Sequence, residues 1–134
     1  MSNTETNKAV FRRFIESMDK QDYLATRAMM SADFRAHPSG QTMPAEGYEQ
    51  MGRMFYAAFP DGSHQVHAMI AEGDLVVARI TFAGTHDGNF MGIPRSHKRA
   101  SCTGFMMARV AGGKIAEMWG EFDQQFMQHS GIVG

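Results

Sequence analysis

The sequence predicts an α+β fold in which N-terminal helices cover one face of a long, curved antiparallel sheet. Two observations support this prediction. Apolar residues recur at helical spacing as far as Phe59, and from Ser63 to Asp123 the pattern changes to period two. The run Phe59-Pro60-Asp61-Gly62 breaks the chain between these two regions. With 134 residues, the chain has the length of a single domain, residues 1–134, built around one core.

Three helices are predicted in the first half of the chain. The first covers residues 9–18 and has an apolar stripe of Val10, Phe11, Phe14, Ile15 and Met18. Asp22 is placed to cap the second, in which Leu24 and Ala28 are expected to face inward. After a short extended segment at 34–37, the third helix is expected to open at Pro44, because proline lacks an N–H that the first helical position does not need.

Four strands are predicted after the break, over residues 63–71, 75–86, 98–110 and 114–122. Short turns join the first to the second and the third to the fourth, which predicts antiparallel neighbours. The two middle strands carry apolar residues on both faces, and the helices can cover only one face. We therefore expect a homodimer through the sheet, centred on Thr81, Phe105 and Met107.

Composition and charge exclude several classes of protein. The formal net charge is -1, so the chain has no general field for nucleic acid, and the basic run Arg95–Arg99 is interpreted as a solvated loop. No apolar run approaches the roughly 18 residues of a membrane span, and the N-terminus lacks a targeting pattern. Cys102 is the only cysteine, which fits a reducing compartment, so a cytoplasmic location is expected.

Cofactor and metal motifs are also missing from the sequence. The patterns GxGxxG, GxxxxGK[ST], HExxH, CxxC and GxSxG do not occur. His64 and His67 lie three residues apart in a predicted strand, so they point to opposite faces and cannot share a metal. The 13 methionines are scattered over predicted core positions, where methionine fills gaps. We therefore expect no metal and no cofactor.

Asp123 follows the last strand and allows two interpretations. It could project into an apolar cavity, where desolvation would raise its pKa towards that of a general acid or base. It could equally cap a short terminal helix that begins at Gln124. Gly120, three residues earlier, permits a bulge that would change the face on which Asp123 lies. His37 and His86 are the histidines expected near the same cavity.

Four segments resemble a known family in their order and spacing. They are Phe59-Pro60-Asp61, Ala71-Glu72-Gly73-Asp74, the run Gly84–Pro94, and Gly113–Trp119 followed by Asp123. In these segments and over nearly the whole chain, the sequence resembles the SnoaL-like polyketide cyclase family. That family lies within the wider group that includes nuclear transport factor two and ketosteroid isomerase.

This resemblance implies a cone-shaped α+β barrel around a deep apolar pocket, commonly dimeric through the sheet. It also implies that the aspartate matched by Asp123 is the acid/base of an intramolecular aldol ring closure that needs neither metal nor cofactor. We therefore expect Asp123 and His37 to be catalytic. An apolar small-molecule substrate is expected to contact Phe14, Phe55, His86, Phe90 and Trp119.

Two other functions fit the same scaffold, because a fold alone does not fix an activity. An isomerase or dehydratase would need Asp123 or His37 paired with a hydrogen-bond donor such as Tyr23 or Tyr48. A module that binds a small ligand without reaction would need only the apolar pocket. The groups that face into the pocket therefore distinguish these possibilities.

Overall fold

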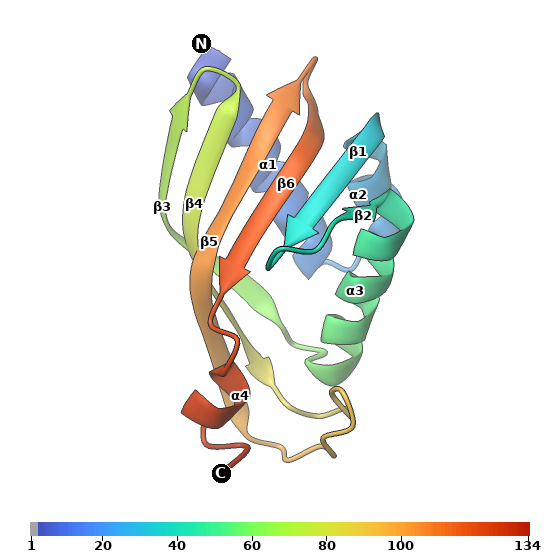
Figure 1. Ribbon diagram of the computed structural model, residues 1–134, viewed down its shortest axis with the longest axis vertical. Coiled ribbons are helices and arrows are strands. Elements are labelled where there is room, and N and C mark those ends of the chain that lie inside the picture. The colour runs from blue at the N-terminus through green and yellow to red at the C-terminus, as the bar shows by residue number, and fades with distance from the viewer. Residues whose placement is uncertain (1–2) are drawn as a thin grey trace.

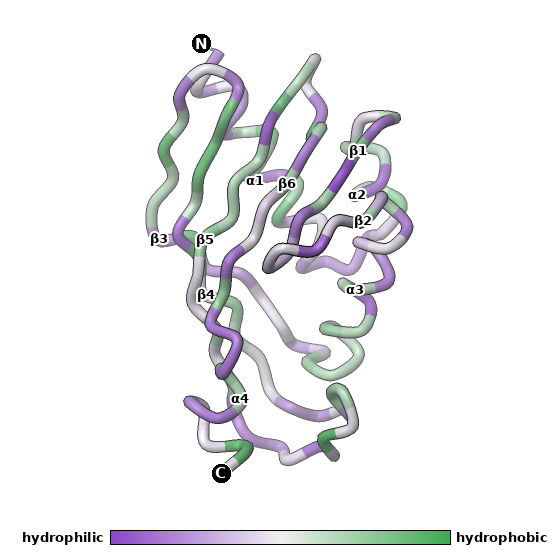
Figure 2. Tube along the Cα trace, in the orientation of Figure 1, coloured by the Kyte–Doolittle hydropathy of each residue, from purple (hydrophilic) through white to green (hydrophobic). Residues whose placement is uncertain are grey.

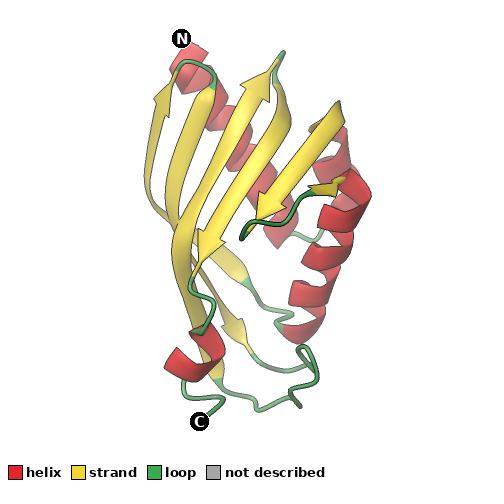
Figure 3. Cartoon of the chain, viewed as in Figure 1, coloured by secondary structure: helices red, strands yellow, loops and turns green. Residues whose placement is uncertain are grey.

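The computed structural model describes residues 3–134 and confirms the α+β prediction (Figure 1). The elements in chain order are α1 (Asn3–Asp19), α2 (Tyr23–Ala28), β1 (Met30–Pro38), β2 (Met43–Pro44), α3 (Ala45–Ala58), β3 (Ser63–Glu72), β4 (Leu75–Thr85), β5 (Arg99–Ala111), β6 (Lys114–Phe122) and α4 (Phe126–His129). The six strands form one sheet in the order β2-β1-β6-β5-β4-β3. Helix α1 crosses behind the sheet, α3 stands beside β1 and β2, and α4 lies at the lower end (Figure 3).

The main core lies between α1 and the inner face of the sheet. The apolar stripe predicted for the first helix is buried, with Phe11 and Phe14 fully removed from solvent. It packs with inward-facing residues of the middle strands, namely Val76, Ala78, Ile80, Met106, Ala108 and Val110. Figure 2 shows the hydrophobic residues that run through β4. Burial of each large side chain contributes about 1.5–3 kcal/mol, so this contact fixes α1 across the sheet.

Helix α2 is capped as predicted but buries a different face. The carboxylate of Asp22 accepts a hydrogen bond from the Ala25 N–H at 3.1 Å. Leu24 was expected to face inward, and this expectation is wrong, since Leu24 is 84% exposed. The buried residue is Thr26, whose hydroxyl bonds to that of Ser17 in α1 at 2.7 Å. In a helix of 6 residues, that polar contact turns Leu24 to the opposite side.

The extended segment predicted at 34–37 joins the sheet as part of β1. β1 runs parallel to β6, with Ala36 opposite Met118 and His37 opposite Trp119. It also pairs with the two-residue strand β2, which the sequence did not reveal. Pro44 belongs to β2 and is the N-cap of α3, with an extended backbone, so the predicted first helical position is shifted by one residue. The other four strands follow the predicted antiparallel order.

The expected bulge at Gly120 is absent, because Gly120 pairs in register with Met106. The irregularity in the β5–β6 pair lies instead between Arg109 and Val110, away from the end of the strand. Gly104 marks the close approach of the two strands. A Cβ atom there would lie 2.2 Å from the carbonyl oxygen of Glu121, so only glycine fits.

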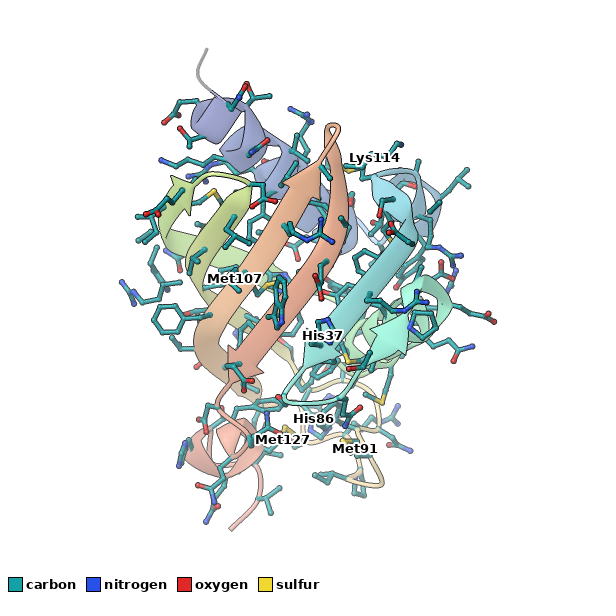
Figure 4. The ribbon with its side chains drawn as sticks, turned by 45° about the horizontal axis from the view of Figure 1, so that its top comes forward. His37, His86, Met91, Met107, Lys114 and Met127 are labelled. Atoms are coloured by element: carbon teal, nitrogen blue, oxygen red, sulfur yellow. The ribbon has the colours of Figure 1, made fainter. Side chains whose placement is uncertain are left out.

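The outer face of the sheet carries a row of apolar side chains across β3, β4, β5 and β6. In this row Ile70 pairs with Val77, Val77 with Met107, and Met107 with Trp119. Ile70 is 68% exposed, and Phe105, on the next row, is 53% exposed. In Figure 4, Met107 and His37 lie on the face of the sheet opposite α1. No helix within residues 3–134 is long and apolar enough to cross a membrane.

We predict that two copies of the chain pair through this outer face, because a contiguous apolar patch is otherwise left in water. Phe105→Glu should convert the dimer to a monomer in sedimentation velocity, since a stable interface of about 1,000 Å² or more would then bury an unpaired charge. Leu24→Glu is the matched control, because it changes an equally apolar, exposed residue on α2. A wild-type monomer at micromolar concentration would contradict this prediction.

Candidate functional site

A cavity of about 330 Å³ lies between the inner face of the sheet and helices α2 and α3. Its size falls in the range of small-molecule sites. Its wall is largely apolar and includes Met18, Tyr48, Met51, Phe55, Phe82, Phe90, Met106, Met118 and Phe126. The groups on its border that can transfer a proton include His37, Tyr56, His64 and Asp123.

Aromatic rings form one wall of the cavity. The Phe55 ring lies 5.2 Å from that of Phe90 and 6.2 Å from that of Phe82, measured between centroids. Phe55 comes from α3, Phe82 from β4 and Phe90 from the loop 86–98. Phe55 and Phe90 therefore stand where a substrate would contact them, although the chain separates them by more than thirty residues.

Phe14 and His86 were expected to contact substrate, and the structure places neither on the cavity wall. Phe14 is fully buried in the core between α1 and the sheet. Its ring stacks on that of Tyr48, with 6.5 Å between the centroids. Its position in the middle of the α1 stripe turns it onto the sheet instead of towards the opening. The core and the cavity wall are both apolar, so the sequence alone does not distinguish a residue of one from a residue of the other.

His86 stabilises the loop 86–98, which follows β4. Its Nδ1 accepts the Ser96 N–H at 3.2 Å, and its backbone oxygen accepts the N–H groups of Ser96 and His97. Because Nδ1 accepts, the ring proton sits on Nε2, which is buried without a hydrogen-bond partner among the described residues. The ring lies 5.5 Å from that of Phe59. His86 is therefore a structural residue of the loop.

His37 and Trp119 border the cavity, but their strand register places them in the outward row of the sheet. Their rings stack at 5.4 Å. The Nε2 of His37 lies 2.6 Å from the Glu117 carboxylate, and its Nδ1 lies 3.0 Å from the Thr42 hydroxyl. Both ring nitrogens are thus occupied, and the Thr42 contact must open before His37 can reach a substrate.

Asp123 lies at the rim of the cavity, and its carboxylate contacts residues that follow it in the sequence. One oxygen accepts the Gln125 N–H at 3.0 Å, and the other lies 2.6 Å from Nδ1 of His129. Gln125, not Asp123, is the N-cap of α4, so the capping interpretation is displaced by two residues. Hydrogen bonds from His129 and Gln125 lower the pKa of Asp123. The expected increase through desolvation is therefore wrong, because this carboxylate stays in contact with solvent.

The two tyrosines considered for an isomerase face other partners. The Tyr48 hydroxyl donates to the sulfur of Met18 at 3.7 Å, and burial raises the pKa of Tyr48. The Tyr23 ring lies under the guanidinium of Arg53 at 4.0 Å. Neither is hydrogen-bonded to Asp123 or His37 in residues 3–134, so the expected pairing with a donor is not formed.

A carboxylate at the end of α1 forms a second acidic group beside the cavity. Asp19 accepts three hydrogen bonds: from the Tyr56 hydroxyl at 2.8 Å, from the His64 backbone N–H at 2.8 Å, and from the His64 ring through Nδ1 at 2.7 Å. Tyr56 and His64 both line the cavity. The last turn of α1 has no basic residue, so these donors offset the negative end of the helix dipole.

Burial acts to raise the pKa of Asp19, but the hydrogen bonds and the charge of His64 outweigh it and leave the pKa below its ordinary value. Asp19 in turn raises the pKa of Tyr56, in addition to the larger effect of burial, so this hydroxyl stays protonated. At neutral pH the cluster therefore holds a carboxylate surrounded by donors. The proton between Asp19 and His64 resides on Nδ1.

Sequence reasoning missed this cluster. His64 was considered only as a metal ligand with His67, and within residues 3–134 no three acidic, histidine or cysteine side chains gather to hold a metal. Asp19 was not singled out at all. The one local signal was a histidine whose period-two register placed it on the inner face beside Val66 and Phe82. Its partner lies 45 residues earlier, which no local pattern reveals.

The fold and the cavity define a class: a cone-shaped α+β protein with an apolar cavity between its sheet and its helices. The sequence model of the SnoaL-like polyketide cyclase family matches residues 8–129, and the chain belongs to that family. Among curated protein sequences, none matches the chain.

Solved structures share this fold. IdmH from Streptomyces antibioticus, described as a candidate polyketide cyclase, is 26% identical, with a TM-score of 0.85 over 92% of this chain and 96% of IdmH. AclR from Streptomyces galilaeus, described as a candidate hydroxylase, is 24% identical, with a TM-score of 0.89 over 96% of this chain and 83% of AclR. A SnoaL-like protein from Jannaschia is 21% identical, with a TM-score of 0.88 over 100% of this chain and 97% of its own.

We predict that the Asp19 cluster contributes to stability in a pH-dependent way. Asp19→Asn should lower the free energy of unfolding by about 1–3 kcal/mol at pH 7, because hydrogen bonds to a charged group are weakened. The folded pKa lies below the ordinary value of 3.8, so this contribution is present above that pH and is lost as the pH falls through the folded value.

The measurement is urea unfolding of wild type and variant between pH 7 and pH 3. The difference between the two should shrink at the acid end. Glu16→Gln, which neutralises an exposed residue of the same helix, is the control and should be nearly neutral. A difference that stays constant over the whole range would argue against an ionised, hydrogen-bonded Asp19.

Proposed function

We propose that the chain is a cofactor-independent, cyclase-like enzyme that closes a ring within an apolar ketone by an aldol-type reaction. The observation that supports this most directly is an apolar cavity with proton-transferring groups on its border, in a member of the SnoaL-like polyketide cyclase family. IdmH, described as a candidate polyketide cyclase, shares the fold over most of both chains. The apolar wall suits a substrate with little charge.

The proposed chemistry needs only proton transfer and orientation. A base removes a proton from the carbon between two carbonyl groups, and the resulting enolate carbon attacks a third carbonyl of the same molecule. One C–C bond forms, the attacked oxygen becomes an alkoxide, and this alkoxide takes up one proton. The product is an isomer of the substrate, so no oxidant, reductant or other co-reactant is consumed. The cavity contributes by holding the reacting carbons close together and by excluding water.

The family resemblance assigns Asp123 as acid/base of this reaction. Its carboxylate is ionised at neutral pH and can accept a proton, although the hydrogen bonds that lower its pKa also make it a weaker base than an ordinary aspartate. His129, 60% exposed, can adjust as the carboxylate becomes protonated. His37 is proposed to assist at the rim once its contact with Thr42 opens.

We predict that Asp123→Asn lowers turnover by roughly 10²–10⁴-fold, because asparagine keeps the shape and the Gln125 contact but cannot accept the proton. The assay follows a synthetic aryl triketone by chromatography with mass detection, where ring closure gives a product of unchanged mass. Thermal unfolding should be nearly unaffected.

Asp87→Asn is the matched control, since Asp87 forms the same kind of pair with His97, at 2.8 Å, outside the cavity. Full activity in Asp123→Asn would remove Asp123 from the chemistry. Tight binding of the triketone without conversion by the wild-type chain would favour a ligand-binding module instead.

A further inference from the structure

His64 is the histidine whose environment matches that of an acid/base group inside the cavity. It lies at the start of β3 on the inner face, opposite Phe82, and the two rings are 4.8 Å apart. Its side chain is 13% exposed, against 32% for Asp123 and 22% for His37. It is therefore more shielded from solvent than either residue expected to be catalytic.

The hydrogen bonds of His64 fix its tautomer. The Asp19 carboxylate can only accept, so the nitrogen that meets it at 2.7 Å, Nδ1, carries the proton. In the neutral ring Nε2 then has a free lone pair. The backbone N–H of the same residue also donates to Asp19, at 2.8 Å, so both the ring and the chain are anchored to one carboxylate. Little freedom remains for the ring to turn.

The free nitrogen reaches open space. Among the described residues, 3–134, none forms a hydrogen bond with Nε2 of His64, and the one side-chain polar atom there that is buried without a partner is Nε2 of His86. Nε2 of His64 is therefore accessible, and the residue lines the cavity. His37 differs on this point, because both of its ring nitrogens are occupied.

We propose that His64 is a catalytic acid/base of this cavity and that Asp19 is its positioning residue. The proposal deepens the proposed function and rests on it for the identity of the natural reaction. Nε2 takes the proton from the acidic carbon, and the ring becomes an imidazolium ion that Asp19 stabilises. After the C–C bond has formed, Nε2 returns the same proton to the alkoxide, so one group serves both steps and the balance closes.

The Asp19–His64 pair suits proton transfer better than the exposed carboxylate of Asp123 does. Around His64 the partners that stabilise charge are fixed before the reaction, and apolar groups such as Phe82 keep water away. Tyr56 also helps to hold the carboxylate of Asp19 in place. Its hydroxyl donates a hydrogen bond, at 2.8 Å, to the Asp19 oxygen that Nδ1 of His64 contacts. For a reacting carbon inside the cavity, His64 therefore takes the acid/base role that the family resemblance gives to Asp123. Asp123, at the solvent-exposed rim, serves only a substrate whose reacting carbon lies at the mouth of the cavity.

The test uses 5-nitrobenzisoxazole, a small apolar probe that needs only a base. The base takes the proton from C3, the N–O bond breaks, and 2-cyano-4-nitrophenolate forms, whose absorbance is followed directly. The base then releases the proton to solvent. The wild-type chain should accelerate this elimination above the rate of free imidazole at matched concentration. Absence of any such acceleration would overturn the proposal.

His64→Asn is the informative variant, because the asparagine amide can still donate to Asp19 while the Nε2 position is lost. It should reduce kcat/KM by roughly 10²-fold, within the usual contribution of a general base. His67→Asn makes the same change three residues along the same strand, where the ring bonds to Thr81 on the outer face, and should leave the rate unchanged. Equal rates for wild type and His64→Asn would overturn the proposal.

The role of Asp19 is tested with Asp19→Asn in both backgrounds. Asp19→Asn should slow the wild-type chain several-fold and have no further effect on His64→Asn, because a positioning residue acts only through the group it holds. Equal slowing in both backgrounds would show a merely structural role for Asp19 and contradict its assignment as positioning residue.

This experiment separates the two proposals. The probe reaction does not depend on ring closure, so a base at His64 can be detected even where no triketone is converted. Conversion of the triketone that survives His64→Asn but not Asp123→Asn would leave the proposed function standing and overturn the assignment of His64. Loss in both variants would place both groups in the reaction.

Discussion

The packing of α1 against the inner face of β4 and β5 is the contact on which the rest of the structure depends. It buries Phe11 and Phe14 completely, together with facing residues such as Val76 and Ala108. Helix α1 also contacts β3. The helix ends at Asp19 before it has covered the remainder of the sheet. The cavity exists because the sheet is longer than the helix that covers it.

The part of the inner face that α1 leaves uncovered is closed by elements from distant parts of the chain. Helix α3 supplies Phe55 and Tyr56, the loop 86–98 supplies Phe90, and the C-terminal segment supplies Phe126. Gly104 lets β5 approach β6 where a Cβ atom would collide with backbone. The wall of the site is therefore built from parts of the chain that meet only in the folded protein.

The hydrogen bonds of Asp19 at the end of α1 affect both the stability of the fold and the proposed proton transfer. A carboxylate at a helix C-terminus is unfavourable, and Asp19 is retained there with three donors, two of them from His64. The same hydrogen bonds that stabilise Asp19 fix the orientation of the His64 ring beside the cavity. The residue that terminates the core helix thus also positions the proposed acid/base group, whereas Asp123 pairs with His129 at the solvent-exposed rim of the cavity.

The sequence by itself determined the fold class, the first three helices and the four strands that follow them, the apolar stripe of α1 and the capping role of Asp22, because each rests on local periodicity or a contact between near neighbours. The four motifs between Phe59 and Asp123 also indicated the family. Only the tertiary structure decided the parallel pairing of β1, the outward turn of Leu24 and the placement of His86 in a loop anchor. It alone brought His64 to Asp19, since a contact between residues 45 positions apart depends on how a helix end and a strand start meet across the core, which no local pattern encodes.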